Sequence, residues 1–374
     1  MYDLVVIGGG PAGCAAAITA VRAGADVLLL EAGDYPRHKV CGEFISPDAC
    51  RLLRSLIGEF LPLARCPRIS RARIYIDNQV LETEIQPAAL SVARFELDAA
   101  LWAAAACAGV ETRLQTTVEK VEGTGPYHVR TPTERLLASS VINASGRWSK
   151  LNAQPQVASC AAIGMKAHFH EVEPAQSVDL YFFPGGYCGV SPVMSAGASD
   201  GPVLNVSAMV DRRKGASFAD IFSCHRDLWR RSRGWQPVTQ TTTTYPLSFR
   251  KPEPLEGKIL LAGDSAGFID PFVGDGIALA LHTGVMASQA LARFWQGERT
   301  LTGAAEDYRG EYNAHIAPCF KAAARIRRLL SLPRVLRWPL TRLVQITRWT
   351  PHFLNATRPG ASSVDQEHKN KVAA

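Results

Sequence analysis

The residues best suited to chemistry in this 374-residue chain are three glycines near its N-terminus. Gly8, Gly10 and Gly13 form the pattern Gly-x-Gly-x-x-Gly, with Pro11 and Ala12 inside it. The first glycine permits a tight turn, the second lets the backbone approach a pyrophosphate, and the third lets a helix pack closely on a strand. The free N–H groups at the start of that helix attract phosphate charge. The pattern therefore indicates a dinucleotide-binding site.

The elements around these glycines are those that the motif requires. Residues 3–7 contain an unbroken apolar run that is typical of a buried parallel strand. Residues 11–23 are rich in alanine and predict a helix, and 27–30 predict a second strand. Glu31 stands at the end of that strand, where its carboxylate can accept hydrogen bonds from a ribose.

A second glycine- and aspartate-rich region lies far along the chain. Gly263 and Asp264 follow the apolar strand expected over 258–262. The sequence Gly274-Asp275-Gly276-Ile277 then precedes an apolar helix that we expect to reach Trp295. The N-terminus of such a helix favours a nearby negative charge by about 0.3–1 kcal/mol. This region therefore predicts a second contact with a long bound dinucleotide.

Cys41 and Tyr187 are the candidate catalytic residues. Cys41 follows the basic run 37–39, which predicts a lowered thiol pKa, although a packed thiol at a turn is an equal alternative. Tyr187 is either a hydrogen-bond donor facing a bound cofactor or a tyrosine of the core. His168 and His170 share one face of a predicted strand. The sequence shows no third ligand for a metal, so we expect no metal site.

The helices and strands that position these residues show two kinds of sequence pattern, which together predict an α/β fold. A hairpin is expected around Asp77-Asn78, and short alternating strands fill 158–245, so we interpret these parts as an antiparallel substrate domain. A strand over 116–121 and a helix over 217–229 are also expected. The expected division is a discontinuous nucleotide-binding domain at 1–65, 95–157 and 246–312, an inserted substrate domain at 66–94 and 158–245, and a basic helical C-terminal region at 313–374.

Three motifs in this order resemble those of the FAD enzymes with the para-hydroxybenzoate hydroxylase fold: the N-terminal fingerprint, the run 36–43, and the region 263–276. The Cys-Gly-Glu stretch at 41–43 is most similar to the geranylgeranyl reductases and the flavin-dependent halogenases. The resemblance covers about residues 1–310 and implies a Rossmann-like domain that holds FAD. The FAD-binding positions that it implies are Gly8, Gly10, Pro11, Ala12, Gly13, Glu31, Ala32, Arg37, Cys41, Gly42, Arg94, Val118, Ala144, Gly146, Gly263, Asp264, Gly274, Asp275, Gly276 and Ile277.

The resemblance also implies roles for several of these positions. Glu31 corresponds to the acid that holds the adenosine ribose, and the Val118 backbone lies where the family contacts adenine. Arg37 and Arg94 correspond to arginines along the pyrophosphate and the ribityl chain, with surface ion pairing as their alternative. Asp264 corresponds to an acid beside the same part of FAD, with helix capping as its alternative.

The matched motifs leave three functions open. Halogenases of this branch carry Trp-x-Trp-x-Ile-Pro where residues 187–192 contain no tryptophan, so we do not expect halogenation. Prenyl reductases carry Tyr-x-Trp-x-Phe-Pro, of which this chain keeps Tyr187 and Pro192. We expect first an NAD(P)H-dependent monooxygenase acting on a small apolar substrate, aromatic or polyketide-like. Saturation of C=C bonds in an isoprenoid chain is the alternative, and electron transfer to a partner is the third candidate.

The net charge of +7 comes from the C-terminal region. Residues 312–364 contain nine basic residues and no acidic one, and Pro333, Pro339 and Pro351 are expected to divide them into short helices. Such a region suits a helical layer packed on the body, contact with an anionic membrane surface, or docking of an acidic carrier protein. The net charge is the one feature that favours nucleic-acid binding, so we expect no binding of nucleic acid.

The remaining composition predicts a cytoplasmic location, peripheral on the membrane if the basic region binds one. The nine cysteines include no Cys-x-x-Cys pair, which is typical of buried thiols in a reducing compartment. The N-terminus has no basic segment of the kind that opens a secretory signal. No window of eighteen apolar residues occurs, so we expect no transmembrane helix.

Overall fold

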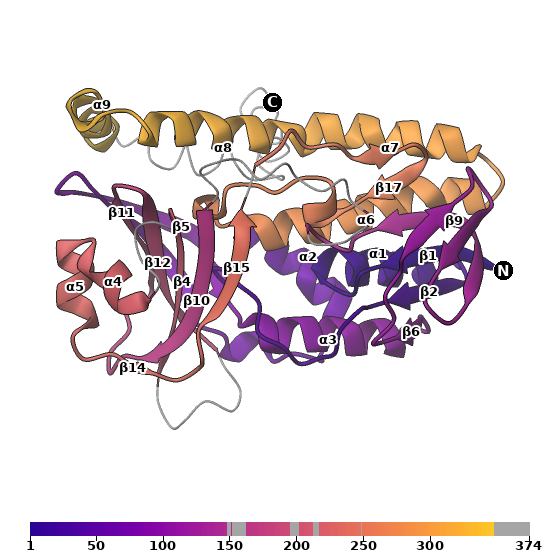
Figure 1. Cartoon of the computed structure of the whole chain (residues 1–374), viewed down its shortest axis with the longest axis horizontal. Coiled ribbons are helices and arrows are strands. Elements are labelled where there is room, and N and C mark those ends of the chain that lie inside the picture. Colours follow the sequence, from indigo (N-terminus) through magenta and orange to yellow (C-terminus); the bar gives the residue numbers. More distant parts are fainter. Residues whose placement is uncertain (148–150, 152–161, 195–201, 212–216, 248, 348–374) are drawn as a thin grey trace, which may run out of the picture.

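The computed structural model describes residues 1–147, 151, 162–194, 202–211, 217–247 and 249–347. These residues form two sheets at opposite ends of an elongated body, and long helices run between them (Figure 1). This arrangement confirms the predicted α/β class with a Rossmann-like half.

The first sheet is mainly parallel and contains the N-terminal strand. Its strands run in the order β16-β17-β9-β1-β2-β6, and a hairpin of β7 and β8 extends it beside β9. The central strands β1 and β2 are buried, because their continuous apolar runs are covered on both faces. The bounds are β1 (Tyr2–Ile7), β2 (Val27–Leu30), β6 (Glu111–Arg113), β7 (Lys120–Glu122), β8 (Tyr127–Arg130), β9 (Arg135–Asn143), β16 (Leu255–Glu256) and β17 (Ile259–Leu261).

Helices cover this sheet and pack tightly on one another. A Cβ on Gly284 would lie 2.1 Å from the carbonyl oxygen of Ala12, so only glycine allows this close approach of α6 to α1. The predicted long apolar helix is therefore a packing partner of the fingerprint helix. The bounds are α1 (Pro11–Arg22), α2 (Pro47–Ile57), α3 (Arg94–Cys107), α6 (Gly276–Trp295) and α7 (Leu301–His315).

The second sheet is antiparallel except where β4 and β11 pair in parallel. Its order is β14-β10-β13-β12-β11-β4-β5-β3, with β15 paired to β10, and two short helices cover its outer end. It also takes in Phe44–Ile45, which the expected boundaries assigned to the nucleotide-binding part. The bounds are β3 (Phe44–Ile45), β4 (Arg68–Ile76), β5 (Gln79–Ser91), β10 (Ala162–His170), β11 (Ser177–Phe183), β12 (Gly186–Val193), β13 (Val203–Asp211), β14 (Gln236–Pro237), β15 (Thr242–Leu247), α4 (Phe218–Ser223) and α5 (Arg226–Ser232).

Two expected elements differ from the structure. Residues 116–119 leave the sheet, because Gln115 has φ +51° and the Thr116 N–H bonds to the Glu31 carbonyl instead. The helix expected over 217–229 is two helices, since His225 caps the second by accepting the N–H of Asp227 at 3.2 Å.

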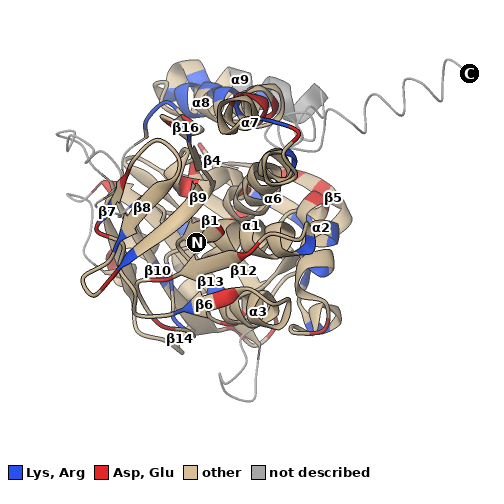
Figure 2. Cartoon of the chain, turned by 90° about the vertical axis from the view of Figure 1, so that its right-hand side faces the viewer, with Lys and Arg blue, Asp and Glu red and all other residues tan. Residues whose placement is uncertain are grey.

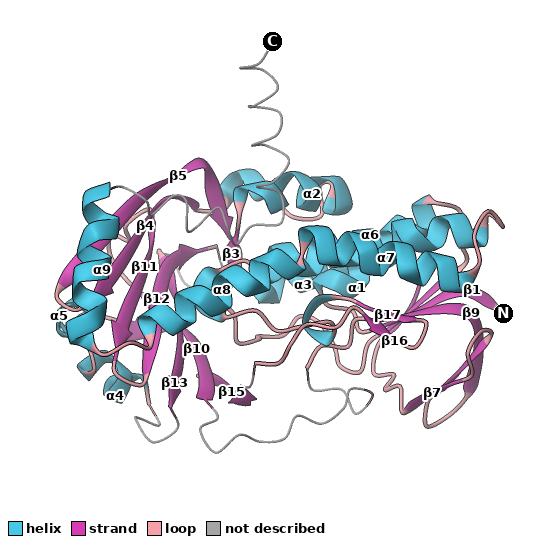
Figure 3. Ribbon diagram, turned by 90° about the horizontal axis from the view of Figure 1, so that it is seen from above, coloured by secondary structure: helices cyan, strands magenta, loops and turns pink. Residues whose placement is uncertain are grey.

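Two basic helices close the described chain. The helix α8 (Ala317–Leu330) continues the line of α7 toward the second sheet, and α9 (Arg334–Thr347) lies across the end of that sheet (Figure 3). Pro339 lies inside α9, so it does not divide the chain there as predicted, whereas Pro333 does separate the two helices. Pro351 and the rest of 348–374 lie outside the described residues. Among the described residues, no helix combines the length and the apolar character needed to cross a membrane.

Candidate functional site

The glycine turn between β1 and α1 leaves space at only one of its three glycines. A Cβ on Gly8, whose φ is +101°, would lie 2.5 Å from the Ala144 carbonyl oxygen, and one on Gly13 would lie 1.7 Å from that of Gly8. Around Gly10 the nearest atom is Nη2 of Arg94, 4.0 Å away. Pro11 and Ala12 follow as the first residues of α1. The turn is thus packed from behind and open at Gly10, as a phosphate at a helix N-terminus requires.

Glu31 lies at the end of β2, beside this turn. Its carboxylate accepts the N–H of Gly9 at 2.9 Å and that of Gly33 at 3.0 Å, and it pairs with Arg37 at 2.7 Å. Burial alone would raise the pKa of the Glu31 carboxyl, but Lys39, Arg37 and the Gly33 N–H lower it below its ordinary value. An ionised, fixed carboxylate is therefore available to accept hydroxyl hydrogen bonds, and Arg37 contacts it directly.

Arg94 is held by a buried carboxylate rather than by a surface partner. Its guanidinium forms two hydrogen bonds to Asp98, at 2.6 and 2.7 Å, and Lys39 adds a third contact to that carboxylate at 3.4 Å. Asp98 is fully buried at the first turns of α3. Because this fork is rigid, it also fixes Nη2 of Arg94 next to Gly10.

The two glycine motifs meet although about 250 residues separate them. A Cβ on Gly263 would lie 2.9 Å from that of Ala12, and Gly146 donates its N–H to Ser265 at 2.8 Å. Ala144 donates its N–H to the carbonyl of Ile7. Asp264 is the middle residue of the short 3₁₀ turn η3 (Gly263–Ser265), and its Oδ2 lies 3.7 Å from Nε of Arg147. These segments form one continuous rim around the start of α1.

The remaining FAD positions implied by the resemblance lie at three places. Val118 is buried in the core of the first half, and Ala32 is exposed next to Glu31. The loop that includes the 3₁₀ turn η4 (Pro271–Val273) leads into α6, where Asp275 is the N-cap and Ile277 is buried. Gly274 has φ +80°, and a Cβ there would lie 3.3 Å from the Phe44 ring, so the loop packs against the end of the Cys41–Glu43 turn.

A fully buried charged cluster supports the Cys41–Glu43 turn. Glu43 has φ +56°, accepts a hydrogen bond from Lys166 Nζ at 2.7 Å, and lies 2.8 Å from Nε2 of His168. The Arg94 backbone N–H also donates to Glu43, at 2.8 Å. All three side chains of the cluster are at most 1% exposed. Burial alone would raise the pKa of the Glu43 carboxyl, but His168 and Lys166 lower it below its ordinary value.

The sequence interpretation missed Lys166 and the role of His168. A lysine inside the buried strand β10 is the signal that could have revealed the cluster, because lysine is almost never fully buried without a partner. His170 is only partly buried at the end of the same strand. Across the described residues, no three metal-ligating side chains converge, and His168 serves Glu43.

The environment of Cys41 corrects the expected effect of the basic run on its thiol. Burial raises the pKa of Cys41, and Arg94 offsets this only in part. Arg37 and Lys39 do not lower the pKa because they face Glu31 and Asp98 instead. The Cys41 carbonyl accepts a hydrogen bond from Asn205 Nδ2 at 3.1 Å, which ties the turn to β13. The thiol is thus a protonated group held at a fixed place.

A largely apolar pocket lies between the loop 271–275 and the second sheet. It encloses about 730 Å³ of empty space, part of it open to solvent. Gly42 opens onto it, and Tyr187 and Phe272 meet edge to face with ring centres 6.3 Å apart. Burial raises the pKa of Tyr187 well above its ordinary value, so its phenol stays protonated. The apolar lining consists of Phe44, Ala72, Ile74, Ile85, Val178, Leu180, Val190, Phe272 and Val273.

Comparison with known proteins agrees with this geometry. The FAD dependent oxidoreductase family matches residues 3–36. Menaquinone reductase of Mycolicibacterium smegmatis is 28% identical over 366 residues, which cover 90% of this chain and 86% of that protein. This chain is an FAD-dependent oxidoreductase. Another relative of the oxidoreductase is digeranylgeranylglycerophospholipid reductase 3 of Methanosphaera stadtmanae, 24% identical over 355 residues, with coverage of 88% and 86%.

Solved structures share the fold of this oxidoreductase. The flavin-dependent brominase Bmp2 superposes with a TM-score of 0.77 at 19% identity, and 99% of each chain is covered. The myxobacterial halogenase CndH superposes with a TM-score of 0.72 at 21% identity over 86% of this chain and 82% of that one. The oxidoreductase therefore has the fold of the flavin-dependent halogenases, and its sequence is similar to those of the reductases, in agreement with the resemblance of the motifs.

Proposed function

We propose that this oxidoreductase uses FAD to saturate a C=C bond in the isoprenoid part of a lipid-soluble substrate. The observation that carries the proposal is the pocket, which is lined mainly by apolar side chains and reaches Gly42, the residue after Cys41. The two relatives support it, since the name of each denotes reduction of an isoprenoid compound. Hydroxylation, expected first from the sequence, has no comparable support.

The residues around the glycine turn fit FAD. The space left at Gly10 would take the pyrophosphate, Glu31 would accept the ribose hydroxyls, and Arg94 would neutralise phosphate charge from its place beside Gly10. The loop 274–277 would hold the redox-active ring at the N-terminus of α6. Bound there in its reduced form, FAD supplies a hydride, and the positive end of α6 favours the negative charge of that form.

The protein's own residues would complete the addition across the double bond. Saturation needs a hydride at one carbon and a proton at the other. The Cys41 thiol, whose pKa is raised, holds its proton at neutral pH, so its Sγ–H is suited to donate it. Arg94 stabilises the thiolate that remains, as its charge acts to lower the pKa of this thiol. Tyr187 and the apolar side chains that line the pocket would exclude water and orient the isoprenoid chain of the substrate. We assign the renewal of the reduced cofactor to NAD(P)H, which would visit the site transiently.

Anaerobic turnover tests this function against its rivals. The FAD-loaded enzyme, NAD(P)H and menaquinone in detergent are combined without oxygen, and the product mass is measured. Reduction predicts a gain of two hydrogens per saturated bond. A requirement for oxygen, with labelled dioxygen entering the product, would identify a monooxygenase instead. Electron transfer would reduce only the quinone ring and leave the isoprenoid C=C bonds intact. Its gain of two hydrogens would be lost when the product is reoxidised before the mass is measured, whereas the gain from saturation would remain.

The variant Cys41→Ala separates proton transfer to the substrate from reduction of the flavin by NAD(P)H. We expect its NAD(P)H-driven bleaching of the flavin to match the wild type while saturation falls by about 10²-fold or more, the usual contribution of a positioned acid. Cys50→Ala, which replaces a buried thiol on α2, is the matched control. Equal saturation by Cys41→Ala and wild type would remove Cys41 from the mechanism.

A further inference from the structure

The outer face of α8 carries a basic stripe. Lys321, Arg325 and Arg328 are exposed and spaced by four and three residues, whereas Cys319 and Ala323 are buried against the body. Residues three and four apart lie on one side of a helix, so the three charges point away from the molecule together. Neither α8 nor α9 contains an acidic residue, and both stand out in blue without red in Figure 2.

The first turns of α9 add an apolar patch beside this stripe. Val335 is 82% exposed, Leu336 58% and Trp338 45%. They account for three of the nine large apolar side chains that are exposed in the described part of the chain. Arg334 and Arg342, both exposed, flank them on the same helix. Clustering of leucine, tryptophan and arginine on a short helix is typical of elements that lie in a membrane interface.

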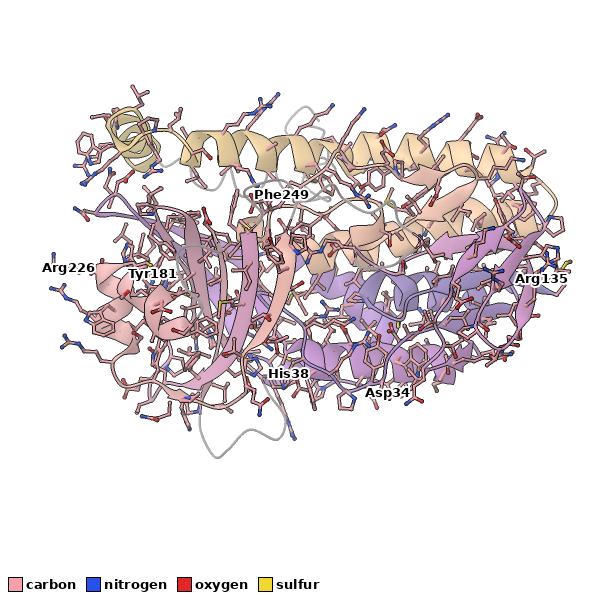
Figure 4. All side chains as sticks on the ribbon, viewed as in Figure 1. Asp34, His38, Arg135, Tyr181, Arg226 and Phe249 are labelled. Carbon is pink, nitrogen blue, oxygen red and sulfur yellow. The ribbon has the colours of Figure 1, made fainter. Side chains whose placement is uncertain are left out.

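We define residues 317–342 as the arm. Two other arginines of the arm fasten it to two segments that contribute residues to the pocket, the loop after Asp270 and the β4–β5 hairpin. Arg327 on α8 forms an ion pair with Asp270 and lies over the ring of Phe249, below α8 in Figure 4. Asp270 directly precedes the loop that lines the pocket. At the other end, Arg337 forms two hydrogen bonds of 2.7 Å with Asp77, at the tip of the β4–β5 hairpin.

We infer that the outer side of this arm docks the enzyme on an anionic lipid bilayer. The stripe would contact the head groups, and Val335, Leu336 and Trp338 would enter the outer apolar layer. An acidic protein would satisfy the charges and leave that patch without a partner, so a bilayer fits better. The inference rests on the proposed function, since it gives an enzyme for lipid-soluble substrates access to the phase that contains them.

Vesicle sedimentation of the full-length, FAD-loaded protein tests the docking without any turnover. We expect binding to phosphatidylcholine vesicles that contain phosphatidylglycerol, weak binding to phosphatidylcholine alone, and release by salt. Lys321→Glu/Arg325→Glu/Arg328→Glu should lower the partition coefficient by about tenfold or more, because each basic group near an anionic surface contributes roughly fivefold. Val335→Ser/Leu336→Ser/Trp338→Ser should also weaken binding.

The matched control is Lys120→Glu/Arg130→Glu/Arg135→Glu. It makes the same change of one lysine and two arginines on exposed side chains of the β7–β9 region. Arg135 lies at the far end of the molecule from α9 (Figure 4). This control should bind vesicles like the wild type. Equal loss in both triple variants, no binding of the wild type, or binding to an acidic carrier protein in place of vesicles would each overturn the inference.

A short-chain, water-soluble isoprenoid quinone separates this inference from the proposed function. The arm variants should reduce it at the wild-type rate, since the pocket is unchanged. If the wild type reduces this compound yet ignores vesicles, the docking fails and the function stands. If it binds vesicles through the arm and saturates no isoprenoid compound, the function fails, and the docking loses its stated purpose.

Discussion

The glycine turn at 8–13 and the turn at 41–43 border the same candidate site and keep their shapes by different means. In the first, backbone packs on backbone, and an added Cβ at Gly13 would lie 1.7 Å from a carbonyl oxygen. In the second, the left-handed Glu43 is held by ion pairs and hydrogen bonds to Lys166, His168 and Arg94. The turn that we propose holds the cofactor thus depends on missing side chains, and the turn beside the proposed substrate pocket depends on buried charged ones.

Substitutions of glycine should break the first turn most severely. Gly13→Ala forces backbone atoms apart, so we expect little folded protein and no bound flavin. Gly10→Val meets open space and should fold normally, yet its side chain would occupy the place of the pyrophosphate. Thermal unfolding and the flavin absorbance of the purified variants distinguish the two effects. Yellow protein from Gly10→Val would contradict the assignment of that space to FAD.

The turn at 41–43 should be broken by removing one charge of the Glu43–Lys166 ion pair. Glu43→Gln leaves Lys166 buried without its counter-charge, and we expect a loss of about 3–5 kcal/mol in the free energy of unfolding. Glu43→Gln/Lys166→Met should cost less than the two single changes together, because it removes both charges. Urea unfolding measures all three variants. Glu82→Gln, which breaks the exposed pair with Arg71, is the control and should cost about 1 kcal/mol or less.

Filling the pocket should sharpen the distinction between the cofactor and substrate sides. Ile74 is only partly buried, so Ile74→Trp can occupy pocket space without rebuilding the core. We expect normal FAD content and about a tenfold or greater fall in kcat/KM for a long isoprenoid substrate, with a smaller fall for a short one. Steady-state kinetics with both chain lengths checks this. Equal loss for both substrates would place the long chain elsewhere.

The smallest expected effect concerns the pH dependence of stability. Burial raises the pKa of Asp270 to about 6, although Arg327 acts in the opposite direction. The folded state therefore holds this proton more tightly than the unfolded chain, and the stability it contributes is lost as the pH rises through about 6. Between pH 5 and 7 this amounts to about 1 kcal/mol. Asp270→Asn should lack this part of the pH dependence in urea unfolding, and an unchanged profile would refute the assignment.

The sequence by itself was enough to single out the first half of the candidate site. Gly8 and Gly13 are required by close backbone approaches, and Gly263 has a φ of +59°. Glu31 stands at a strand end, so residue type and local spacing were enough to single out these four residues. The same local logic predicted the long helix α6 and the β4–β5 hairpin. It also indicated the family, because these motifs occur in a fixed order.

Only the tertiary structure decided what the charged residues do. The basic run 37–39 predicted a lowered thiol pKa, but the fold turns Arg37 to Glu31 and Lys39 to Asp98, and burial raises the pKa of Cys41. Lys166 lies 123 residues from Glu43 and carries no periodic signal of that partnership. Contacts between residues so distant in sequence depend on how the two sheets pack together. Local sequence patterns carry no information about that packing. The charged cluster, the pocket and the anchoring of the basic arm therefore appear only in the folded chain.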